Sequence, residues 1–435
     1  MFDLAAEVNR RNNNDPNFTV SFIPWYQSSP NGLYYFGGRR KLNGQVPTLS
    51  DIQANASLAG PQPSINPSVQ KATTVIEDII SNKSFVAQMA ANVYQAHKTF
   101  LDIGLNGLGG DDWSEFAYLH NYLGYAVNDT LDVVAGSGGE SLWDGLYESM
   151  YFSATNWRTI DGGLSRLPSA FHPLVDDITF MNRKIQRMSY NESTSRVTLQ
   201  WKDQPLDRVF QNASYDYAIV TVPLALVRTW RLPDFSSTLS TAISSYPYSQ
   251  VCKVALQFQT RFWEHFAEPI YGSCSTETDI PGIGSICYPS YDINSTGPGV
   301  MLASYTSSDD GLRWASIPEK EHVQYVVDAM AEIHGDVVYQ QYTGQYNRRC
   351  WILDEYETIS WASPDVGMRK AFIPAFFEVE KGVIMSGEGT SYTSSWIASA
   401  LESGVRAAVQ LLLELGLVDE AKAVTEKWMA RWISV

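Results

Sequence analysis

The sequence predicts a mixed α/β fold (α/β or α+β), and three stretches of its pattern support this class. A short apolar run at 383–385 passes through a glycine-containing turn into a small-residue helix, which is typical of a strand–turn–helix unit. Residues 178–258 show the alternating and apolar runs of strands. Residues 61–148 place apolar side chains at three- and four-residue intervals, which predicts helices. A chain with strands on both sides of a long helical segment is neither all-α nor all-β.

The first half of the chain contains one expected hairpin and one helical segment. Residues 31–46, NGLYYFGGRRKLNGQV, combine a turn, an aromatic strand and a second turn, which predicts a hairpin at a sheet edge. The helical segment runs from Pro61 to about Glu148 and includes VQKATTVIEDII, FVAQMAANVYQAHKTFLDI and WSEFAYLHNYLGYAV. We interpret it as a helical insert between strand-containing parts.

Several strand patterns follow the helical segment. ITFMNRKIQRMSY and RVTLQW bracket a turn at Asn191, which predicts two strands joined by that turn. YDYAIVTVPLALV is a near-continuous apolar strand that ends at Pro223, the pattern of a strand buried on both faces. SQVCKVALQFQTRFWE alternates between apolar and polar residues, so we expect a strand with one face in the core.

Two glycine-containing turns are candidates for a phosphate site. The turn at 387–389 leads into a helix N-terminus that Ser394 or Ser395 can cap, and such a terminus suits an anion, although many α/β proteins contain similar turns. Gly136-x-Gly138 lies before a helical pattern, but Ser141 stands where a dinucleotide fingerprint needs its third glycine. We interpret the second turn as a loop between helices and keep phosphate binding as the alternative.

Composition describes a globular chain with an acidic surface. The 435 residues are 44% hydrophobic, which is enough for two or three domains. The formal net charge of −16 at pH 7 argues against a nucleic acid or an anionic membrane as a partner, because like charges repel. No apolar run is long enough to span a bilayer, and the first residues lack the apolar core of a signal peptide. Secreted and cytoplasmic locations both stay open.

Sequons and cysteines bear on the compartment. Seven Asn-x-Ser/Thr sequons suit a glycosylated, secreted protein, although an Asn- and Ser-rich chain also makes several by chance. They begin at Asn17, Asn55, Asn82, Asn128, Asn191, Asn212 and Asn294. The four cysteines form no C-x-x-C motif and the six histidines show no metal-ligand spacing, so no metal site is expected. Buried thiols are the default, and Cys274 and Cys287 can form a disulfide across one loop in an oxidising compartment.

Four stretches, in this order, resemble the flavin-dependent amine oxidase family, and most closely its L-amino-acid oxidase branch. They are IDGGLSRLPSAF (160–171), YDYAIVTVPLALV (215–227), KVALQFQTRFWE (253–264) and SGEGTSYTSSWIASALESGVRAA (386–408). The resemblance implies an FAD-linked amine-oxidase-like fold with a mixed-sheet substrate domain, a helical insert and an incomplete FAD-binding domain. The implied domains are substrate-binding at 1–60 and 241–370, helical at 61–150, and FAD-binding at 151–240 and 371–435.

The resemblance also implies roles for residues near the reacting atoms. Lys253 matches the family lysine that holds a water near the flavin, whereas its position alone also fits an outward-pointing lysine on an edge strand. Tyr288 resembles a tyrosine that binds the substrate carboxylate, and a core tyrosine is the alternative. Ser395 and Trp396 are expected beside the substrate, with Trp396 forming an aromatic wall next to the flavin, although a core tryptophan has the same sequence signature.

A further set of residues is expected to bind FAD. Glu388 resembles the acid that accepts hydrogen bonds from the ribityl chain, and an exposed loop carboxylate is the alternative. The glycines of the set allow the backbone to approach the cofactor closely, and Ile185 resembles the strand residue that meets adenine. The full set is Gly162, Gly163, Ile185, Trp351, Gly387, Glu388, Trp396 and Ile397.

Several positions depart from the family pattern. The chain begins after the G-x-G-x-x-G motif, the ribose-binding acid and the arginine that binds the substrate carboxylate in the family. Gly389 replaces a histidine or aromatic residue, Ser395 replaces a glycine, and Ala398 replaces an acid. We therefore expect an N-terminal partner fragment or a longer form to complete the FAD site, with a homo-oligomer as another possible assembly.

The expected function is that of a flavin-dependent L-amino-acid or amine oxidase. Its substrate would be a small amine or amino-acid derivative, and its products an imine or keto acid, ammonia and hydrogen peroxide. Two alternatives remain: a cofactor-free homologue that performs a tailoring reaction of secondary metabolism, such as cyclisation or isomerisation, and a non-catalytic partner of an intact oxidase.

Overall fold

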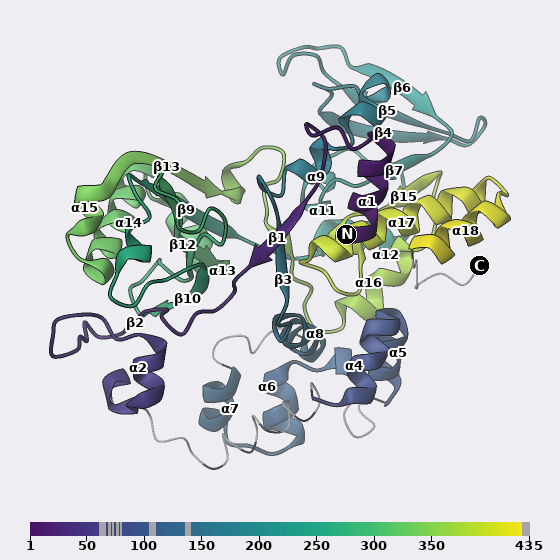
Figure 1. Cartoon of the computed structure of the whole chain (residues 1–435). Helices are drawn as coiled ribbons and strands as arrows, with labels where there is room; N and C mark the ends of the chain where they lie inside the picture. The colour runs from purple at the N-terminus through teal and green to yellow at the C-terminus, as the bar shows by residue number, and fades with distance from the viewer. Residues whose placement is uncertain are drawn as a thin grey trace. The chain divides into compact units, whose positions relative to one another are not determined.

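The computed structural model describes residues 1–60, 67, 71, 74, 78, 81–103, 110–134 and 141–428. Contacts divide the chain into two compact units, each built from three separate segments (Figure 1). Unit 1 comprises Met1–Ser64, Thr155–Thr179 and Gln250–Ser360, and unit 2 comprises Ile65–Ala154, Phe180–Ser249 and Trp361–Val435. The helical segment thus groups with unit 2, and most of the stretch expected as the second substrate-binding segment groups with unit 1.

Unit 1 is built around a six-stranded sheet with the order β13-β9-β12-β11-β10-β2. Its neighbouring strands are antiparallel, except for the parallel pair of β10 and β2. The strands are β2 (Tyr34–Tyr35), β9 (Val251–Phe258), β10 (Ser273–Thr278), β11 (Ile286–Tyr288), β12 (Gly299–Ser307) and β13 (Tyr342–Cys350). Strand β9 is hydrogen-bonded on both sides, by β12 and β13, so it is an interior strand of the sheet.

Alternation along β9 gives its two faces different environments. Val254, Leu256 and Phe258 are fully buried in a core that they share with residues of α14 (Glu319–His334). Because successive side chains of a strand point to opposite faces, Lys253 lies on the face away from this core. The expected strand with one face in the core is therefore confirmed. The other helices packed in this part of unit 1 are α13 (Ser308–Ser316) and α15 (Val337–Gln341).

A smaller cluster in unit 1 joins segments from both sides of the helical segment. Strands β1 (Phe22–Trp25) and β3 (Trp157–Ile160) pair antiparallel. Their neighbours include Ala5 and Val8 of α1 and Leu167 of α9, which form one apolar core with Ile160. The remaining described α-helices of unit 1 are α1 (Phe2–Arg11), α2 (Leu49–Ala54), α9 (Arg166–Ser169) and α10 (His172–Val175).

The expected hairpin at 31–46 is wrong. Only Tyr34 and Tyr35 form a strand, and they pair in parallel with β10 instead of with a returning strand. The local return is a single bridge between Leu33 and Thr48. Because β2 takes its partner from a distant part of the chain, the turn signals on either side did not determine its pairing.

All four cysteines are paired, so the expectation of buried thiols is wrong. Cys274 and Cys287 form the disulfide that the sequence left open, and it links β10 to β11. Cys252 and Cys350 form a second disulfide between β9 and β13. Both links lie within unit 1.

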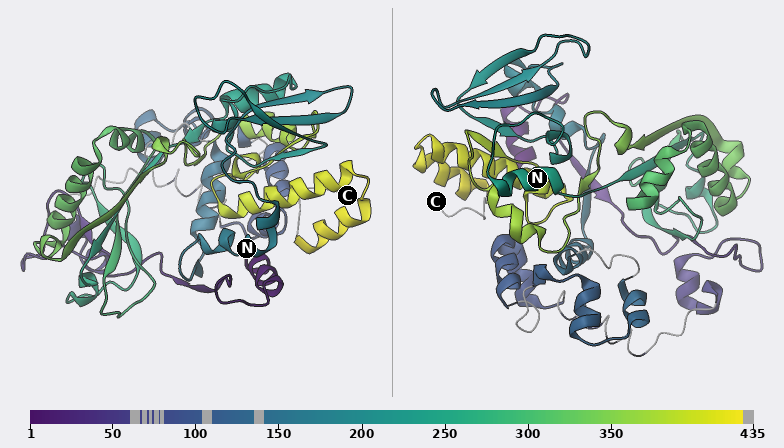
Figure 2. Two further views of the ribbon diagram at one scale, coloured as in Figure 1. Left: turned by 90° about the horizontal axis from the view of Figure 1, so that it is seen from above. Right: turned by 180° about the vertical axis from the view of Figure 1, so that it is seen from behind.

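The described residues of unit 2 form three small sheets. Strands β4 (Ile185–Asn191), β5 (Arg196–Trp201) and β6 (Gln211–Tyr215) form an antiparallel sheet, which Figure 2 shows in two views. The turn expected at Asn191 is confirmed, because β4 ends there and β5 begins five residues later. Strand β7 (Ala218–Val220) pairs in parallel with β15 (Val383–Met385). Strand β8 (Tyr248–Ser249) pairs antiparallel with β14 (Trp361–Ala362).

The helices of unit 2 include the expected helical segment, which has its own core of Phe100, Leu119, Trp143, Leu146 and Tyr147. Its described helices are α4 (Lys83–Ala91), α5 (Val93–Ile103), α6 (Glu115–Ala117), α7 (Val127–Val134) and α8 (Leu142–Phe152), with a π-helical turn at Tyr118–Tyr122. The others are α11 (Leu224–Val227), α12 (Ser237–Ser245), α16 (Met368–Phe376), α17 (Ile397–Glu414) and α18 (Val418–Trp428).

Some sequence predictions for this segment fall outside the described residues. Most of VQKATTVIEDII does so, and Gly136 and Gly138 do as well. The residues on both sides of these glycines are helical, in α7 and α8. The described stretch before the glycines is therefore a helix and not the strand that a dinucleotide fingerprint requires. Within the described residues, none of the helices has both the length and the apolar character that crossing a bilayer requires.

Candidate functional site

Lys253 lies on β9, an interior strand of the large sheet of unit 1. It pairs with Tyr305 on β12 and with Arg349 on β13. The alternative of an outward-pointing lysine on an edge strand is therefore wrong, because β9 has neighbours on both sides.

Aromatic rings surround the ammonium group of Lys253. Its Nζ lies 4.3 Å from the centroid of the Tyr305 ring and 5.3 Å from that of Trp351. Both distances are in the range of cation–π contacts. Burial lowers the pKa of Lys253, because a partly desolvated amine loses the hydration that favours its charge. Among the described residues no carboxylate forms an ion pair with Lys253, so this amine can serve a ligand or a water.

Trp351 reaches Lys253 from the end of the neighbouring strand. It follows Cys350, the last residue of β13, and starts the short helix η6 (Trp351–Leu353). The structure thus brings Trp351 and Lys253 together, as two residues of the expected set. Tyr305 completes the group and was missed, because its position opposite Lys253 depends on strand pairing that no local pattern records.

Tyr288 has a different environment from the one expected for a substrate-binding residue. Its side chain is fully buried in the core of unit 1. Its hydroxyl lies 2.7 Å from Nε2 of His334 and accepts a hydrogen bond from Thr276 at 3.2 Å. Burial raises the pKa of Tyr288 and lowers the pKa of His334 to about 4, so the pair is neutral. This position favours the core tyrosine that the sequence left as the alternative.

In unit 2 the predicted residues gather at the turn between β15 and α17. The strand ends at Met385, and the chain then passes through the short helix η7 (Glu388–Thr390) before α17 begins. Ser403 of α17 accepts a hydrogen bond from the backbone N–H of Gly387 at 2.9 Å. Gly387 has a φ of 111°, and a Cβ there would lie 3.3 Å from the carbonyl oxygen of Thr221. The turn therefore needs glycine at this position.

Glu388 is half-buried and holds this turn together. One carboxylate oxygen accepts the backbone N–H of Ala362 at 2.8 Å, and the other accepts that of Ser395 at 2.6 Å. Burial raises the pKa of Glu388, and these two hydrogen bonds oppose the increase. The alternative of an exposed loop carboxylate is wrong. Each oxygen still has a second lone pair that can accept from a ligand.

Ser395 and Trp396 link the turn to neighbouring elements. Ser395 has a φ of 76° and donates its hydroxyl to the carbonyl of Ala362 at 2.9 Å. The Trp396 ring lies 4.8 Å from that of Tyr151 and 5.3 Å from that of Phe152, both on α8. Its Nε1 is buried and has no hydrogen-bond acceptor within the described part of the chain. A buried N–H without an acceptor suits a polar ligand at this position.

The remaining predicted residues are more scattered. Ile185 is half-buried at the start of β4 in unit 2, and Ile397 starts α17 with 44% of its surface exposed. Gly162 and Gly163 lie in unit 1, in the turn after β3, with φ values of 75° and 101°. Their positive φ values agree with the reason for expecting glycine there. Their roles toward FAD stay predictions.

One buried ion pair and one buried arginine hydrogen bond support the turn, and sequence reasoning missed both. Arg369 of α16 binds both carboxylate oxygens of Asp144 on α8, and it donates to the Ser394 hydroxyl at 2.9 Å. Arg406 of α17 donates to the Thr390 hydroxyl at 2.6 Å. Arginines within the apolar patterns of α16 and α17 were the available signal, because such residues are rarely buried without a partner.

The carboxylate oxygens of Glu402, on α17, are buried, and Arg406 is their charged neighbour. Burial raises the pKa of Glu402 to about 8, although Arg406 and the Ser391 hydroxyl favour its charged form. Burial also lowers the pKa of Arg406 to about 10. Glu402 is therefore largely protonated at neutral pH.

A cavity of about 280 Å³ lies in unit 1 and is not lined by any predicted site residue. Its apolar walls include Leu33, Val46, Phe266 and Ile333, and Arg40 and His334 also border it. Both ring nitrogens of His334 already have partners, Tyr288 and the carbonyl of Met330. The cavity therefore presents no free donor or acceptor from this histidine.

The residues of the unit 2 turn fit a polar ligand of the ribityl type. Glu388 offers unused lone pairs, Trp396 offers a buried N–H, and the glycine turn admits a close approach. Lys253 with its aromatic neighbours fits a site that holds a water in unit 1.

Comparisons with known proteins agree with this chemistry. A family described as flavin containing amine oxidoreductases matches residues 17–412. An L-amino-acid oxidase of Neurospora crassa is 53% identical over 443 residues, which cover 100% of this chain and 63% of that protein. An L-amino-acid oxidase of Siganus canaliculatus is 28% identical over 315 residues, which cover 68% of this chain and 58% of that protein. The chain thus spans less than two thirds of the length of either relative.

Solved structures show the same fold. A redesigned putrescine oxidase aligns with a TM-score of 0.65 at 13% identity, covering 95% of this chain and 85% of that one. A cyclohexylamine oxidase from Brevibacterium oxydans aligns with a TM-score of 0.60 at 14% identity, covering 98% and 85%. At these identities the likeness concerns the fold and not the substrate.

Proposed function

The chain belongs to the flavin-containing amine oxidoreductases, and from this membership we propose that it acts in a flavin-dependent oxidation of an L-amino acid or related amine. The observation that carries the proposal is the 53% identity to an L-amino-acid oxidase along the whole chain. The partly buried Lys253 between two aromatic rings supports it independently. The cofactor of this family is a flavin, and FAD is the form we propose for this protein.

Bound FAD would accept a hydride from the amine-bearing carbon, and its reoxidation would reduce oxygen to hydrogen peroxide. Water would convert the imine product to a keto acid and ammonia. The residues of this chain would position the reactants. Lys253 would donate a hydrogen bond from Nζ to a water, while the faces of Tyr305 and Trp351 keep bulk solvent away from the amine. This arrangement would hold a proton at Nζ close to the reacting oxygen.

The turn between β15 and α17 would orient the cofactor. Glu388 would accept hydrogen bonds from ribityl hydroxyls through the lone pairs that Ala362 and Ser395 leave unused. Trp396 would place its ring beside the flavin and donate its unpartnered N–H to a polar atom. Gly387 would leave space for the backbone to approach the ligand.

We also propose that the protein passes through an oxidising secretory compartment and carries N-linked glycans. All four cysteines form disulfides, and disulfides persist mainly in oxidising compartments. All seven sequon asparagines are exposed, as glycan attachment requires. Together, the paired cysteines and the exposed sequons favour secretion over the cytoplasm.

The experiment that tests the function uses the full chain after incubation with FAD. Bound flavin would be measured by its visible absorption after removal of free cofactor, and hydrogen peroxide would be measured across a panel of L-amino acids, their D-enantiomers and simple amines. We expect peroxide with L-amino acids and none with D-enantiomers. A folded chain that binds FAD and oxidises none of the panel would contradict the proposed substrate class. Conversion of a substrate without flavin would favour the cofactor-free alternative.

A further inference from the structure

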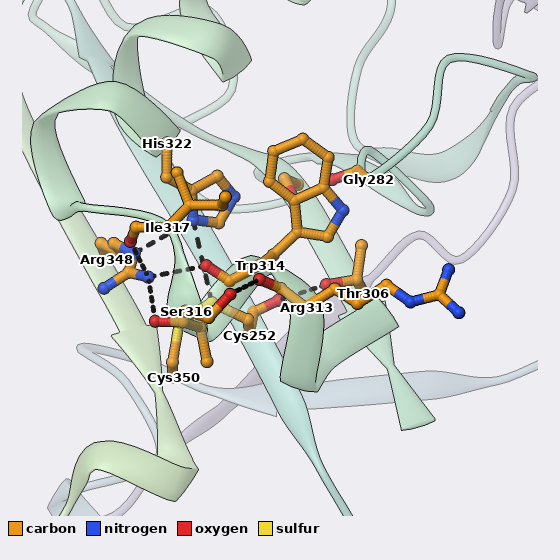
Figure 3. Close-up of a disulfide and its surroundings, with 12 residues drawn as sticks. Cys252, Gly282, Thr306, Arg313, Trp314, Ser316, Ile317, His322, Arg348 and Cys350 are labelled. Carbon is orange, nitrogen blue, oxygen red and sulfur yellow. Dashed lines mark hydrogen bonds between the residues drawn. A yellow bond between two sulfur atoms is a disulfide. The ribbon is translucent and has the colours of Figure 1, made fainter. Parts of the chain in front are cut away.

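The disulfide between Cys252 and Cys350 closes the end of the β9–β13 ladder. The two residues lie directly opposite each other, and Cys350 is the last residue of β13 (Figure 3). Both side chains are buried, at 0% and 4% exposure. The link therefore ties the two strands at the point where β13 ends.

The residues that follow the two cysteines are the central pair of the proposed site. Lys253 follows Cys252, and Trp351 follows Cys350. Lys253 is fixed by the ladder on both sides of β9, whereas Trp351 has already left β13 and has no ladder partner. The 5.3 Å between the Lys253 Nζ and the Trp351 ring thus depends on how firmly the end of β13 is held.

A buried histidine and an arginine surround the disulfide. Nδ1 of His322 lies 4.0 Å from Sγ of Cys252 and accepts the Nε–H of Arg348 at 3.0 Å. Arg348 also donates from Nη2 to the carbonyls of Trp314, Ala315 and Ile317, at 2.8, 3.1 and 3.1 Å. Figure 3 shows Trp314 and Ile317 beside the Arg348 guanidinium. Arg348, two residues before Cys350, thereby anchors β13 to the C-terminal end of α13.

A metal site is the other chemistry that these side chains suggest. The donor atoms of Cys252, His322 and Cys350 lie within 4.8 Å of one another. The disulfide, however, consumes both sulfur donors, and the Arg348 N–H occupies the lone pair of His322 that faces them. Thiolates bind metal only after the disulfide is reduced, so the geometry favours a covalent link over a metal ion.

We propose that the Cys252–Cys350 disulfide, anchored by Arg348, is a positioning element that sets Trp351 against Lys253 and makes this pair sensitive to thiol reductants. In the reductive step a dithiol attacks one sulfur, the S–S bond breaks, and two protein thiols and the cyclic disulfide of the reductant result. The end of β13 then depends on hydrogen bonds alone, and Trp351 moves away from the ammonium group. The effect on catalysis rests on the proposed function, whereas the change in geometry does not.

The test compares the two disulfides of unit 1. Cys274–Cys287 links β10 to β11 and is the matched control, so we would make C252A/C350A and C274A/C287A in the full chain. The first readout is hydrogen–deuterium exchange of peptides covering Lys253 and Trp351. The second is the pH profile of Lys253 labelling by an amine-reactive reagent, because the pKa lowered by burial should return toward normal when Trp351 leaves. A mere loss of stability would not shift that profile.

We expect C252A/C350A to raise exchange around residues 351–353 and to move the midpoint of Lys253 labelling upward by about one pH unit, a tenfold change in the neutral amine fraction. The C274A/C287A variant should leave both readouts unchanged. If C252A/C350A does not fold, reduction in the C274A/C287A background, where only Cys252–Cys350 can open, gives the same comparison. Reoxidation should reverse the change.

Three results separate the possible failures. Unchanged exchange and labelling after loss of Cys252–Cys350 would overturn the positioning role, whatever the activity. Recovery of the native labelling profile by stoichiometric Zn²⁺ in the reduced protein would show a metal site instead and also overturn it. A changed labelling profile in a protein without oxidase activity in any redox state would support the positioning role and contradict only the proposed function.

Discussion

Lys253 and Tyr305 lie directly opposite each other on β9 and β12, with the Lys253 Nζ 4.3 Å from the centre of the Tyr305 ring. This pairing sets the ammonium group of Lys253 against the Tyr305 ring on one face of the unit 1 sheet. No carboxylate among the described residues forms an ion pair with it. A lysine that is partly desolvated and unpaired is costly unless a ligand or water uses its charge. The relationship therefore motivates the first prediction.

Replacing Lys253 with methionine should slow reaction with oxygen while the fold survives. Methionine keeps most of the aliphatic stem but removes the charge that would hold the water. We expect the rate of flavin reoxidation in the FAD-loaded protein to fall by about 10²-fold, a typical size for loss of a proton-transfer group. Stopped-flow measurement of reduction and reoxidation would test this, with Lys320→Met, an exposed lysine on α14, as control. Equal reoxidation rates in both variants would remove Lys253 from the mechanism.

Replacing Arg369 with methionine should destabilise unit 2 strongly. Arg369 is fully buried and is the bidentate partner of Asp144. Its loss leaves a buried carboxylate unpaired, which costs about 3–5 kcal/mol. Urea unfolding would measure the loss, and the double variant R369M/D144L should recover much of it, because both charges are gone. Arg313→Met, which breaks an exposed pair with Asp310, should change little. An R369M variant as stable as the native protein would show that the buried pair is not needed.

Glu402 predicts a dependence of stability on pH. Burial raises its pKa from an ordinary value near 4.5 to about 8, so between these values the folded protein keeps a proton that the unfolded chain has lost. Stability should therefore fall as the pH rises from 4.5 to 8, by about 1.4 kcal/mol per pH unit from this group, and then level off. Glu402→Gln should flatten this part of the curve.

Denaturant unfolding at several pH values would measure the Glu402 effect. Glu414→Gln on the same helix is the matched control, since Glu414 is exposed. We expect the two variants to differ most at pH 8 and to converge as the pH falls below 4.5, where Glu402 becomes protonated in the unfolded chain as well as in the folded protein. Parallel curves for both variants would mean that Glu402 titrates normally in the folded protein.

N-linked glycans should be present on the sequons when the protein is made in a eukaryotic secretory system. The seven asparagines are exposed. Peptide mapping after enzymatic release of glycans should show conversion of these asparagines to aspartate. Asn43, an exposed asparagine outside any sequon, should remain unconverted. Seven unmodified sequons would contradict secretion through this route.

Local patterns predicted the elements whose environment is set along the chain. The alternation of β9 placed Val254 and Lys253 on opposite faces, and the turn at Asn191 joined two strands as expected. The strand–turn–helix unit at 383–404 also follows from residues close together in sequence. In each case the period of apolar residues carries the information.

Long-range partners could not be read from the sequence. Tyr34 and Tyr35 form an edge strand with distant β10 instead of a hairpin, and Cys252 pairs with a cysteine 98 residues away. Tyr288 was expected near the substrate, but its hydroxyl meets His334 in the core. Burial and pairing of this kind depend on tertiary packing, which overrides local preference.

Replacing Glu388 with glutamine should weaken FAD binding more than it weakens the fold. Its two carboxylate oxygens accept the backbone N–H groups of Ala362 and Ser395, and this bridge sets the turn before α17. Glutamine keeps one acceptor but turns an NH₂ toward the other N–H, so one hydrogen bond is lost and a buried donor is left unpaired. Such a change costs about 1–3 kcal/mol, and it also removes lone pairs that would accept from the cofactor.

We expect the dissociation constant for FAD to rise at least about tenfold, the factor that corresponds to 1.4 kcal/mol, while the urea midpoint shifts modestly. Titration of the full chain with FAD, followed by flavin fluorescence, would measure the affinity. Glu192→Gln, which changes an exposed carboxylate paired with Lys381, controls for the loss of one negative charge. If Glu388→Gln unfolds more readily but binds FAD with native affinity, Glu388 serves the fold alone. The two hydrogen bonds from Ala362 and Ser395 would then be needed for the turn but not for cofactor binding.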